Sequence, residues 1–139
     1  MPIVVDASIA RAWALPDESS AYAEAVLAVV EREGVRVPEL WAREVANGLA
    51  VAYLRKRITP ADERAFLAAL SRLRIEVEEA NFALAVIRDG TVAAIRYGLT
   101  AYDAAYVDLA AREKLILATL DSSMRKAAAQ SGVTIFQQP

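Results

Sequence analysis

The sequence contains no cysteine and no histidine among its 139 residues. Their absence excludes disulfide bonds, thiolate nucleophiles, most zinc sites and any serine–histidine–aspartate triad. Hydrolytic chemistry in this chain must therefore use carboxylates, lysine, tyrosine or a hard metal ion held by oxygen. Aspartate and glutamate together number 18, and carboxylate oxygens are the ligands that Mg²⁺ and Mn²⁺ prefer.

Long hydrophobic runs are also missing. No apolar stretch approaches the roughly 18 uninterrupted residues that are needed to cross a bilayer. Residues 1–6 carry no basic segment and end on an acid, so we do not expect a signal peptide. Hydrophobic residues nevertheless make up 56% of the chain, which predicts a packed core. We therefore expect a soluble cytoplasmic protein in which residues 1–139 form a single domain.

The net charge of −2 also limits the possible functions. A protein that coats nucleic acid by charge alone is usually basic, so the acidic balance argues against that class. A nuclease whose carboxylates are neutralised by metal remains compatible with it. Dinucleotide binding is not expected, because no glycine-rich turn follows the first apolar run, residues 3–5.

Strand-like and helix-like segments alternate along the chain. Short runs of Val, Ile and Leu predict strands, and stretches bounded by capping residues, proline or glycine predict helices. The predicted strands are residues 3–5, 35–37, 74–77, 115–120 and 133–136. The predicted helices are residues 19–33, 38–57, 59–73, 81–98 with a break near Asp89-Gly90, 100–113 and 122–130. This alternation predicts an α/β fold with a mainly parallel sheet covered on both faces.

Two acidic residues follow predicted strands. Asp6 comes directly after the first strand, and Asp121 comes directly after the strand at 115–120. Ligands collect at the carboxyl ends of strands in an open parallel sheet, so both side chains are expected on the same rim. Each is equally suited to cap the next helix, and the two roles do not exclude each other.

A third acid, Glu44, lies inside the second predicted helix. It falls on one arc with Leu40 and Gly48, so it faces apolar neighbours. A carboxylate in such a place is costly unless something compensates it. Gly48 leaves room above Glu44, and Asn47 on the adjacent row could hold the carboxylate by a hydrogen bond. The alternative is a structural glutamate that pairs with an arginine.

Asp103 and Asp108 share a predicted helix but lie on different faces. Asp103 projects with Tyr106 toward the expected core. Asp108 precedes Arg112 by four residues and is expected to form a surface ion pair. Thr100 and Asp103 also have capping-box spacing, which gives Asp103 an alternative structural role.

Taken together, Asp6, Glu44, Asp103 and Asp121 predict one acidic cluster at the rim of the sheet. Like charges held close together repel each other unless a proton or a cation intervenes, so one or two divalent ions are expected among them. Metal ions in such a cluster can activate water and stabilise the displacement at a phosphodiester. The cluster therefore predicts metal-dependent hydrolysis.

Four sequence blocks, in this order, carry a resemblance to a known family. They are Val4-Val5-Asp6-Ala7-Ser8, Pro38-Glu39-Leu40-Trp41 leading to Glu44-Val45-Ala46-Asn47-Gly48-Leu49, Leu99-Thr100-Ala101-Tyr102-Asp103-Ala104-Ala105-Tyr106, and Leu117-Ala118-Thr119-Leu120-Asp121. They resemble the successive motifs of PIN domains, most closely those of the VapC toxins of bacterial and archaeal toxin–antitoxin pairs. The resemblance runs from the first strand to the last.

The resemblance implies a three-layer α/β/α fold and a Mg²⁺- or Mn²⁺-dependent endoribonuclease that leaves a 5′-phosphate and a 3′-hydroxyl. It also implies inhibition by a small cognate antitoxin and a homodimer. The residues that match the family's acidic, metal-binding and catalytic positions are Asp6, Glu44, Asp103 and Asp121. Those that match its polar supporting positions are Ser8, Asn47 and Thr119. Some PIN nucleases carry a further acid where this chain has Ser122 and Ser123, so a second metal position has less support than the first.

Further side chains are candidates for contacts with partners. Arg11 and Arg43 lie close in sequence to the acids and could contact flanking phosphates, although solvated surface arginines are the alternative. The stretch Trp13-Ala14-Leu15 could form an exposed apolar patch for an antitoxin. Tyr53 and Leu54 could do the same, and core packing is the alternative for both.

Two rival functions remain open at the level of the sequence. A PIN-like module without catalytic activity could bind RNA or a protein through the same rim. The presence of all four acids favours the enzyme, because a degenerate module is expected to lose one or more of them. A metal-dependent phosphatase or a nuclease that acts on DNA is also possible, because a carboxylate–metal centre does not itself recognise the 2′-hydroxyl.

Overall fold

The sheet lies between two layers of helices. The structure is a computed structural model that describes residues 1–80 and 82–139. In this part of the chain, four parallel strands form a sheet in the order β3-β2-β1-β4. The strands are β1 (Ile3–Val5), β2 (Val35–Pro38), β3 (Ile75–Glu78) and β4 (Leu117–Ala118). The predicted α/β class with a parallel sheet is confirmed.

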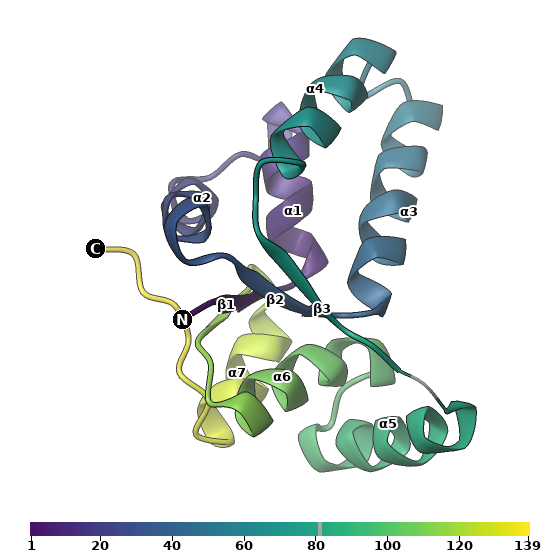
Figure 1. Cartoon of the computed structure of the whole chain (residues 1–139), viewed down its shortest axis with the longest axis vertical. Coiled ribbons are helices and arrows are strands. Elements are labelled where there is room, and N and C mark those ends of the chain that lie inside the picture. The colour runs from purple at the N-terminus through teal and green to yellow at the C-terminus, as the bar shows by residue number, and fades with distance from the viewer. Residues whose placement is uncertain (81) are drawn as a thin grey trace.

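The helices divide between the two faces of the sheet. Helices α1 to α4 lie above the sheet and α5 to α7 lie below it in Figure 1. Their bounds are α1 (Ala7–Ala14), η1 (Pro16–Glu18, a short 3₁₀ turn), α2 (Ala21–Glu33), α3 (Leu40–Leu54), α4 (Pro60–Leu70), α5 (Ala83–Tyr97), α6 (Ala101–Glu113) and α7 (Ser122–Gln130). This is the three-layer α/β/α arrangement that the resemblance implies.

Strand β1 is central in the sheet and wholly buried. It pairs with β2 through Ile3 opposite Val35, and with β4 through Val4 opposite Leu117. Because all three strands are parallel, their carboxyl ends meet at one rim. The rim therefore receives the residues that follow β1 and β4, which include Asp6 and Asp121.

The core fills the space between the sheet and both helix layers. A strand that is covered on both faces needs apolar side chains at every position, and β1 has them. The fully buried side chains around it come mainly from α1, α2 and α6: Ile9, Val26, Val30, Tyr106, Val107 and Leu109. Burial of this apolar surface fixes α6 against the sheet and thereby fixes the position of its first turn, which carries Asp103.

Helix α1 is not among the predicted elements. It begins directly after Asp6, whose side chain accepts a hydrogen bond from the amide of Ile9 as an N-cap. The helix is short and rich in alanine, and it is stabilised by packing against α2 and α3. Leu15 at its C-cap is buried, so of the two alternatives for residues 13–15 core packing holds for Leu15.

Trp13 is half-buried and donates its indole N–H to the carbonyl oxygen of Ala23 over 2.9 Å. It lines a groove between α1, α2 and α4 together with Phe66 and Leu70. Tyr53 and Leu54, by contrast, are exposed at the end of α3, as the hypothesis of an apolar patch for a partner requires.

Other boundaries differ from the predictions. The predicted break near Asp89-Gly90 is wrong, because α5 is continuous through both residues. The predicted start of that helix, Asn81, lies outside the described residues. Pro38 ends β2, and α3 begins only at Leu40. The strand predicted at 133–136 is reduced to one bridge between Leu117 and Ile135, and β4 has only two residues.

The predicted ion pair of Asp108 and Arg112 is confirmed, with Arg112 Nε 2.7 Å from Asp108 Oδ2. Arg112 also donates to both carboxylate oxygens of Glu78, which joins α6 to the end of β3. Within the described residues, no helix combines the length and apolar character that a membrane span requires.

A pair of glycine substitutions tests the continuity of α5. A Cβ atom added at Gly90 would meet no atom within 4 Å. Gly90→Ala should therefore raise the free energy of unfolding by about 1 kcal/mol, the propensity difference in a helix interior. Gly98→Ala at the C-cap should lower it by about 1–2 kcal/mol, because that residue has a positive φ of 64°. Urea denaturation measures both, and a loss of stability in Gly90→Ala would contradict a continuous helix.

Candidate active site

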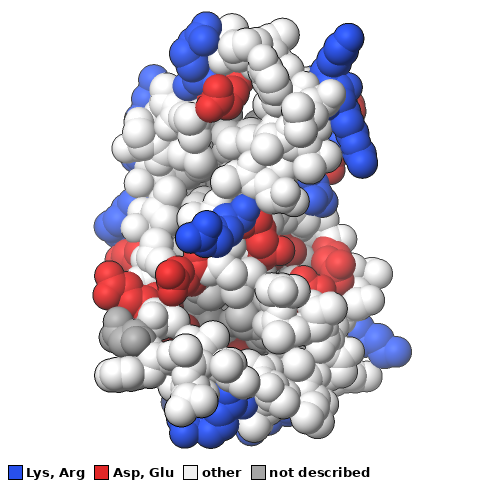
Figure 2. Space-filling view, turned by 90° about the vertical axis from the view of Figure 1, so that its right-hand side faces the viewer, with Lys and Arg blue, Asp and Glu red and all other residues white. Residues whose placement is uncertain are grey.

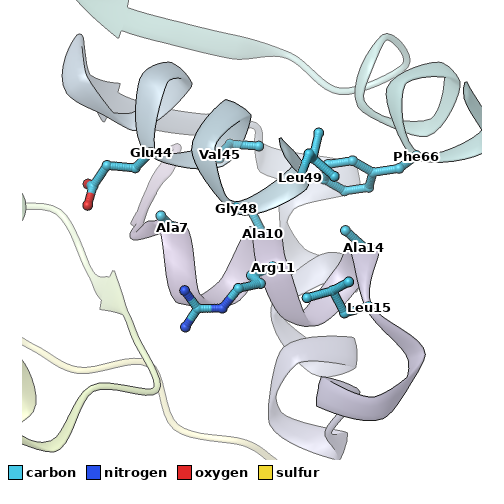
Figure 3. Close-up of a pocket in the computed structure, with 10 residues that line it drawn as sticks. All are labelled: Ala7, Ala10, Arg11, Ala14, Leu15, Glu44, Val45, Gly48, Leu49 and Phe66. Carbon is cyan, nitrogen blue, oxygen red and sulfur yellow. The ribbon is translucent and has the colours of Figure 1, made fainter. Parts of the chain in front are cut away.

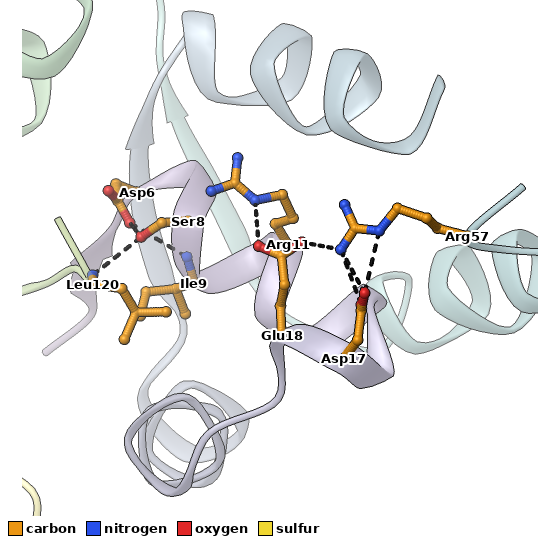
Figure 4. Close-up of polar contacts among 8 residues, drawn as sticks. All are labelled: Asp6, Ser8, Ile9, Arg11, Asp17, Glu18, Arg57 and Leu120. Carbon is orange, nitrogen blue, oxygen red and sulfur yellow. Dashed lines mark hydrogen bonds and ion pairs between the residues drawn. The ribbon is translucent and has the colours of Figure 1, made fainter. Parts of the chain in front are cut away.

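Asp6 is the most deeply buried acid of the predicted cluster, with 4% of its surface exposed. Both of its carboxylate oxygens accept hydrogen bonds from hydroxyl groups. Ser8 Oγ donates to Oδ1 over 2.6 Å, and Thr119 Oγ1 donates to Oδ2 over 2.7 Å. The amide of Ile9 approaches Oδ1 at 3.4 Å. The orientation of the carboxylate is therefore fixed by groups from α1 and from the segment after β4. Figure 4 shows the side of Ser8, which lies between Asp6 and Leu120.

The two hydroxyl groups are themselves held by the backbone that follows β4. The amide of Leu120 donates to Ser8 Oγ over 3.1 Å, and the amide of Asp121 donates to Thr119 Oγ1 over 3.0 Å. Each hydroxyl accepts a backbone hydrogen bond and so directs its own proton to Asp6. This double bridge ties the end of β1 to the end of β4.

Asp103 and Asp121 are half-buried in the first turns of two helices. Asp121 caps α7 by accepting a hydrogen bond from the amide of Met124 over 2.8 Å. The amide of Asp103 donates to Thr100 Oγ1, the N-cap of α6, over 3.2 Å. The predicted capping role is therefore confirmed for Asp6 and Asp121. The second carboxylate oxygen of Asp121, Oδ2, accepts no hydrogen bond from the described residues.

Glu44 is held by a residue that the sequence did not indicate as a site residue. The buried hydroxyl of Tyr106 donates a short hydrogen bond to Glu44 Oε1. Asn47 is exposed and has no side-chain hydrogen bond within the described part of the chain, so its predicted contact with Glu44 is not formed. Tyr106 was predicted only as a core residue, although a tyrosine on a core-facing helix surface usually needs a hydrogen-bond partner.

The Arg11 side chain, and not that of Glu44, lies beside Gly48. A Cβ atom added at Gly48 would lie 3.8 Å from Arg11 Cδ, so the stem of Arg11 passes over α3 at this point. Figure 3 shows Glu44 and the Arg11 guanidinium extending toward the same open side of the groove between α1 and α3. Arg11 pairs with Glu18 over 3.0 Å, whereas Arg43 is exposed and has no ion pair among the described residues.

The acids share one electrostatic neighbourhood. Burial raises the pKa of Asp6, and the charge of Asp121 adds to this effect against the lowering effect of the hydrogen bonds. Burial and then the charge of Asp121 raise the pKa of Asp103. The pKa of Tyr106 is raised by burial, by its hydrogen bond to Glu44, and by the charges of Glu44, Asp6 and Asp103. Asp121 therefore lies close enough to affect Asp6 and Asp103, and Tyr106 lies within reach of the charges of Glu44, Asp6 and Asp103.

The charged surface has a matching pattern. Figure 2 shows acidic side chains in a band across the middle of one face, beside a hollow between the upper and lower parts of the molecule. Within residues 1–80 and 82–139, however, no three acidic side chains lie close enough to hold a metal ion as they stand. The structure brings the predicted acids to one rim without joining them into a finished cage.

Comparisons with known proteins agree with this fold. The PIN domain family matches residues 3–130. The ribonuclease VapC3 of Pyrobaculum aerophilum is 35% identical over 125 residues, which cover 89% of this chain and 92% of that protein. The crystal structure of PAE2754 from the same organism superposes with a TM-score of 0.66 and 27% identity, over 91% of this chain and 86% of that one.

The chain belongs to the PIN-domain family. Its similarity to VapC3 over most of both chains identifies it more narrowly as a PIN domain of the VapC type.

The raised pKa of Asp6 predicts a pH-dependent stability. The folded chain binds the Asp6 proton more tightly than the unfolded chain, whose pKa is near the ordinary 3.8. The resulting stabilisation is present below that value and is lost as the pH rises through the folded pKa. Asp6→Asn removes the buried charge, so it should be more stable than the natural chain at pH 7, and the difference should vanish near pH 3.

Urea denaturation at the two pH values measures this difference. Asp89→Asn, at an exposed position of α5, is the control and should show no comparable gain. An Asp6→Asn gain that is equal at both pH values would contradict the assignment to the ionised carboxylate.

Proposed function

We propose that this chain is a divalent-metal-dependent endoribonuclease and the toxin of a VapBC-type toxin–antitoxin pair. The observation that carries the proposal is the buried Asp6 carboxylate, which two hydroxyl groups hold at the rim beside Asp121. Family membership supports the nuclease class, and the name of the relative, a ribonuclease, supports RNA as the substrate. An RNA substrate is in turn consistent with a cytoplasmic location.

The chemistry of the donor set fits Mg²⁺ or Mn²⁺. Every candidate ligand is a hard oxygen, from Asp6, Glu44, Asp103 and Asp121. The pKa values of Asp6 and Asp103 are raised because burial disfavours the charged carboxylates, so a neutralising partner would stabilise them. A bound divalent ion would supply that charge, activate water and stabilise the phosphodiester displacement. Because the acids form no finished cage among the described residues, Asp103 and Asp121 would need to rotate toward the ion.

The residues of the chain would contribute orientation and substrate binding. Ser8 and Thr119 prevent rotation of the Asp6 carboxylate, so that its position does not depend on the substrate. Arg43 and Arg11 are our candidates for contacts with phosphates on either side of the cleaved bond. Arg11 would have to exchange its ion pair with Glu18 for such a contact.

We further propose that a small antitoxin inhibits the enzyme. The groove between α1, α2 and α4 is lined by apolar side chains that include Trp13, Leu27 and Leu70. It has Glu31 and Arg72 among its lining residues. An amphipathic antitoxin segment would bury its apolar face there and place its charges at the rim.

A cleavage assay tests the enzymatic proposal. The purified protein should cleave end-labelled single-stranded RNA with Mg²⁺ or Mn²⁺ and leave a 5′-phosphate and a 3′-hydroxyl. EDTA and Asp6→Asn should each abolish cleavage, and Asp89→Asn should retain it. A small DNA-binding protein encoded beside the gene should suppress it. Cleavage that persists in EDTA or in Asp6→Asn would rule out the proposed centre. Metal binding without cleavage of any RNA would favour the silent binding module, and cleavage of DNA alone would favour a deoxyribonuclease.

The exposed face of α5 supports a homodimer. Leu84, Ile87 and Ile95 lie on one helical stripe and are 80%, 63% and 77% exposed. The opposite side of α5 packs against α6, and Figure 1 shows α5 at the periphery of the molecule. An apolar stripe of this size is unfavourable in water. A second copy of the same chain would cover it, because a two-fold interface requires only one self-complementary patch.

Light scattering on the purified protein tests the dimer. The expected mass is twice the 15.1 kDa of one chain. Ile95→Glu should give a monomer, because it places a charge in the stripe. Leu67→Glu, at an exposed position of α4, should remain dimeric. A mass of 15.1 kDa for the natural chain would refute the proposal.

A further inference from the structure

Tyr106 has the largest side chain among the fully buried residues, with 1% of its surface exposed. It lies on α6, one turn after Asp103, and its ring belongs to the main core cluster. Only its hydroxyl reaches a polar group, Glu44 Oε1 on α3. The two residues are 62 positions apart in the sequence, so the contact exists only in the folded chain.

This hydrogen bond joins the two helix layers at the rim of the sheet. Helix α3 lies on one side of the sheet and α6 lies on the other (Figure 1). The tyrosine ring has two side-chain torsions, and close packing in the core restricts both. The glutamate side chain has three torsions and is only half-buried. A fixed donor therefore holds a flexible acceptor through Oε1. Oε2 of Glu44 accepts no hydrogen bond from the described residues.

The arrangement repeats the one at Asp6. There, the hydroxyl groups of Ser8 and Thr119 donate to the two oxygens of the Asp6 carboxylate. Hydroxyl donors thus fix the first and the second acid of the predicted set, which come from different elements. Groups that hold metal-binding carboxylates in this way raise metal affinity, because the ligand does not have to be ordered when the ion binds.

We propose that Tyr106 is a positioning residue that presents Glu44 to the divalent ion. This inference rests on the proposed metal-dependent function. Tyr106 does not bind the ion in this proposal. Its hydroxyl proton is directed to Oε1, which fixes the carboxylate and leaves Oε2 available.

Calorimetric titration of the metal-free natural chain with Mn²⁺ tests the proposal without any activity measurement. Tyr106→Phe removes one oxygen atom and keeps the ring. Loss of such a supporting partner typically lowers metal affinity about 10–100-fold, and we expect a loss in this range. Tyr53→Phe is the control. It makes the same exchange at an exposed position near the end of α3, on the helix that carries Glu44, so it should retain Mn²⁺ affinity.

A double substitution separates positioning from a general structural effect. In a Glu44→Ala background, Tyr106→Phe should cause no further loss of Mn²⁺ affinity, because the group that it orients is absent. A similar loss in both backgrounds would overturn the proposal. If Tyr106→Phe does not fold, two larger replacements at position 106 provide the comparison. The side chain of 4-methylphenylalanine fills the space but cannot donate a hydrogen bond. The side chain of 4-aminophenylalanine fills the space and can donate one. Low affinity is expected for the first and near-natural affinity for the second.

The outcomes distinguish this inference from the proposed function. If the natural chain takes up no Mn²⁺ or Mg²⁺, the metal-dependent function fails. If the natural chain and folded Tyr106→Phe bind Mn²⁺ equally well, only the role of Tyr106 is overturned.

Discussion

The candidate site depends on a carboxylate that is buried next to the centre of the sheet. Removing Asp6 from water is costly, and the hydroxyl groups of Ser8 and Thr119 offset part of this cost. Those hydroxyls are oriented by backbone amides that follow β4. The acid is therefore tolerated only while β1 and β4 lie side by side in their observed register. The pairing of these strands and the construction of the candidate site are one and the same constraint.

A second carboxylate connects the remaining layers. Glu44 on α3 receives the hydroxyl proton of Tyr106 on α6, and Tyr106 is packed into the core between α6 and the sheet. The acids are thus supported by elements whose positions are set by apolar packing. Such a site can concentrate negative charge, because the apolar core, and not the charged groups, holds these elements in place. Burial is the main reason that the pKa values of Asp6 and Asp103 are raised, and the charge of Asp121 adds to it.

Local patterns in the sequence predicted much of this, and failed where packing overrode them. Apolar runs and capping residues correctly indicated an α/β fold, and the rule for strand ends placed Asp6 and Asp121 on one rim. The glycine at position 90 suggested a break in α5, but contact with α6 keeps that helix continuous. Helix α1 gave no clear periodic signal, because it has only eight residues and half of them are alanine. Its stability comes from its cap and from its neighbours.

The sequence by itself determined which groups could carry out chemistry: with no histidine or cysteine, only oxygen ligands remain, and their spacing along strands and helices indicated their faces. The tertiary structure alone decided which group holds which. Glu44 is bound by Tyr106, 62 residues away, and not by the neighbouring Asn47, and Asp6 is bound by Thr119, 113 residues away. Periodicity fixes the direction of a side chain within its own element. The partner that it meets depends on how distant elements pack, which local spacing does not encode.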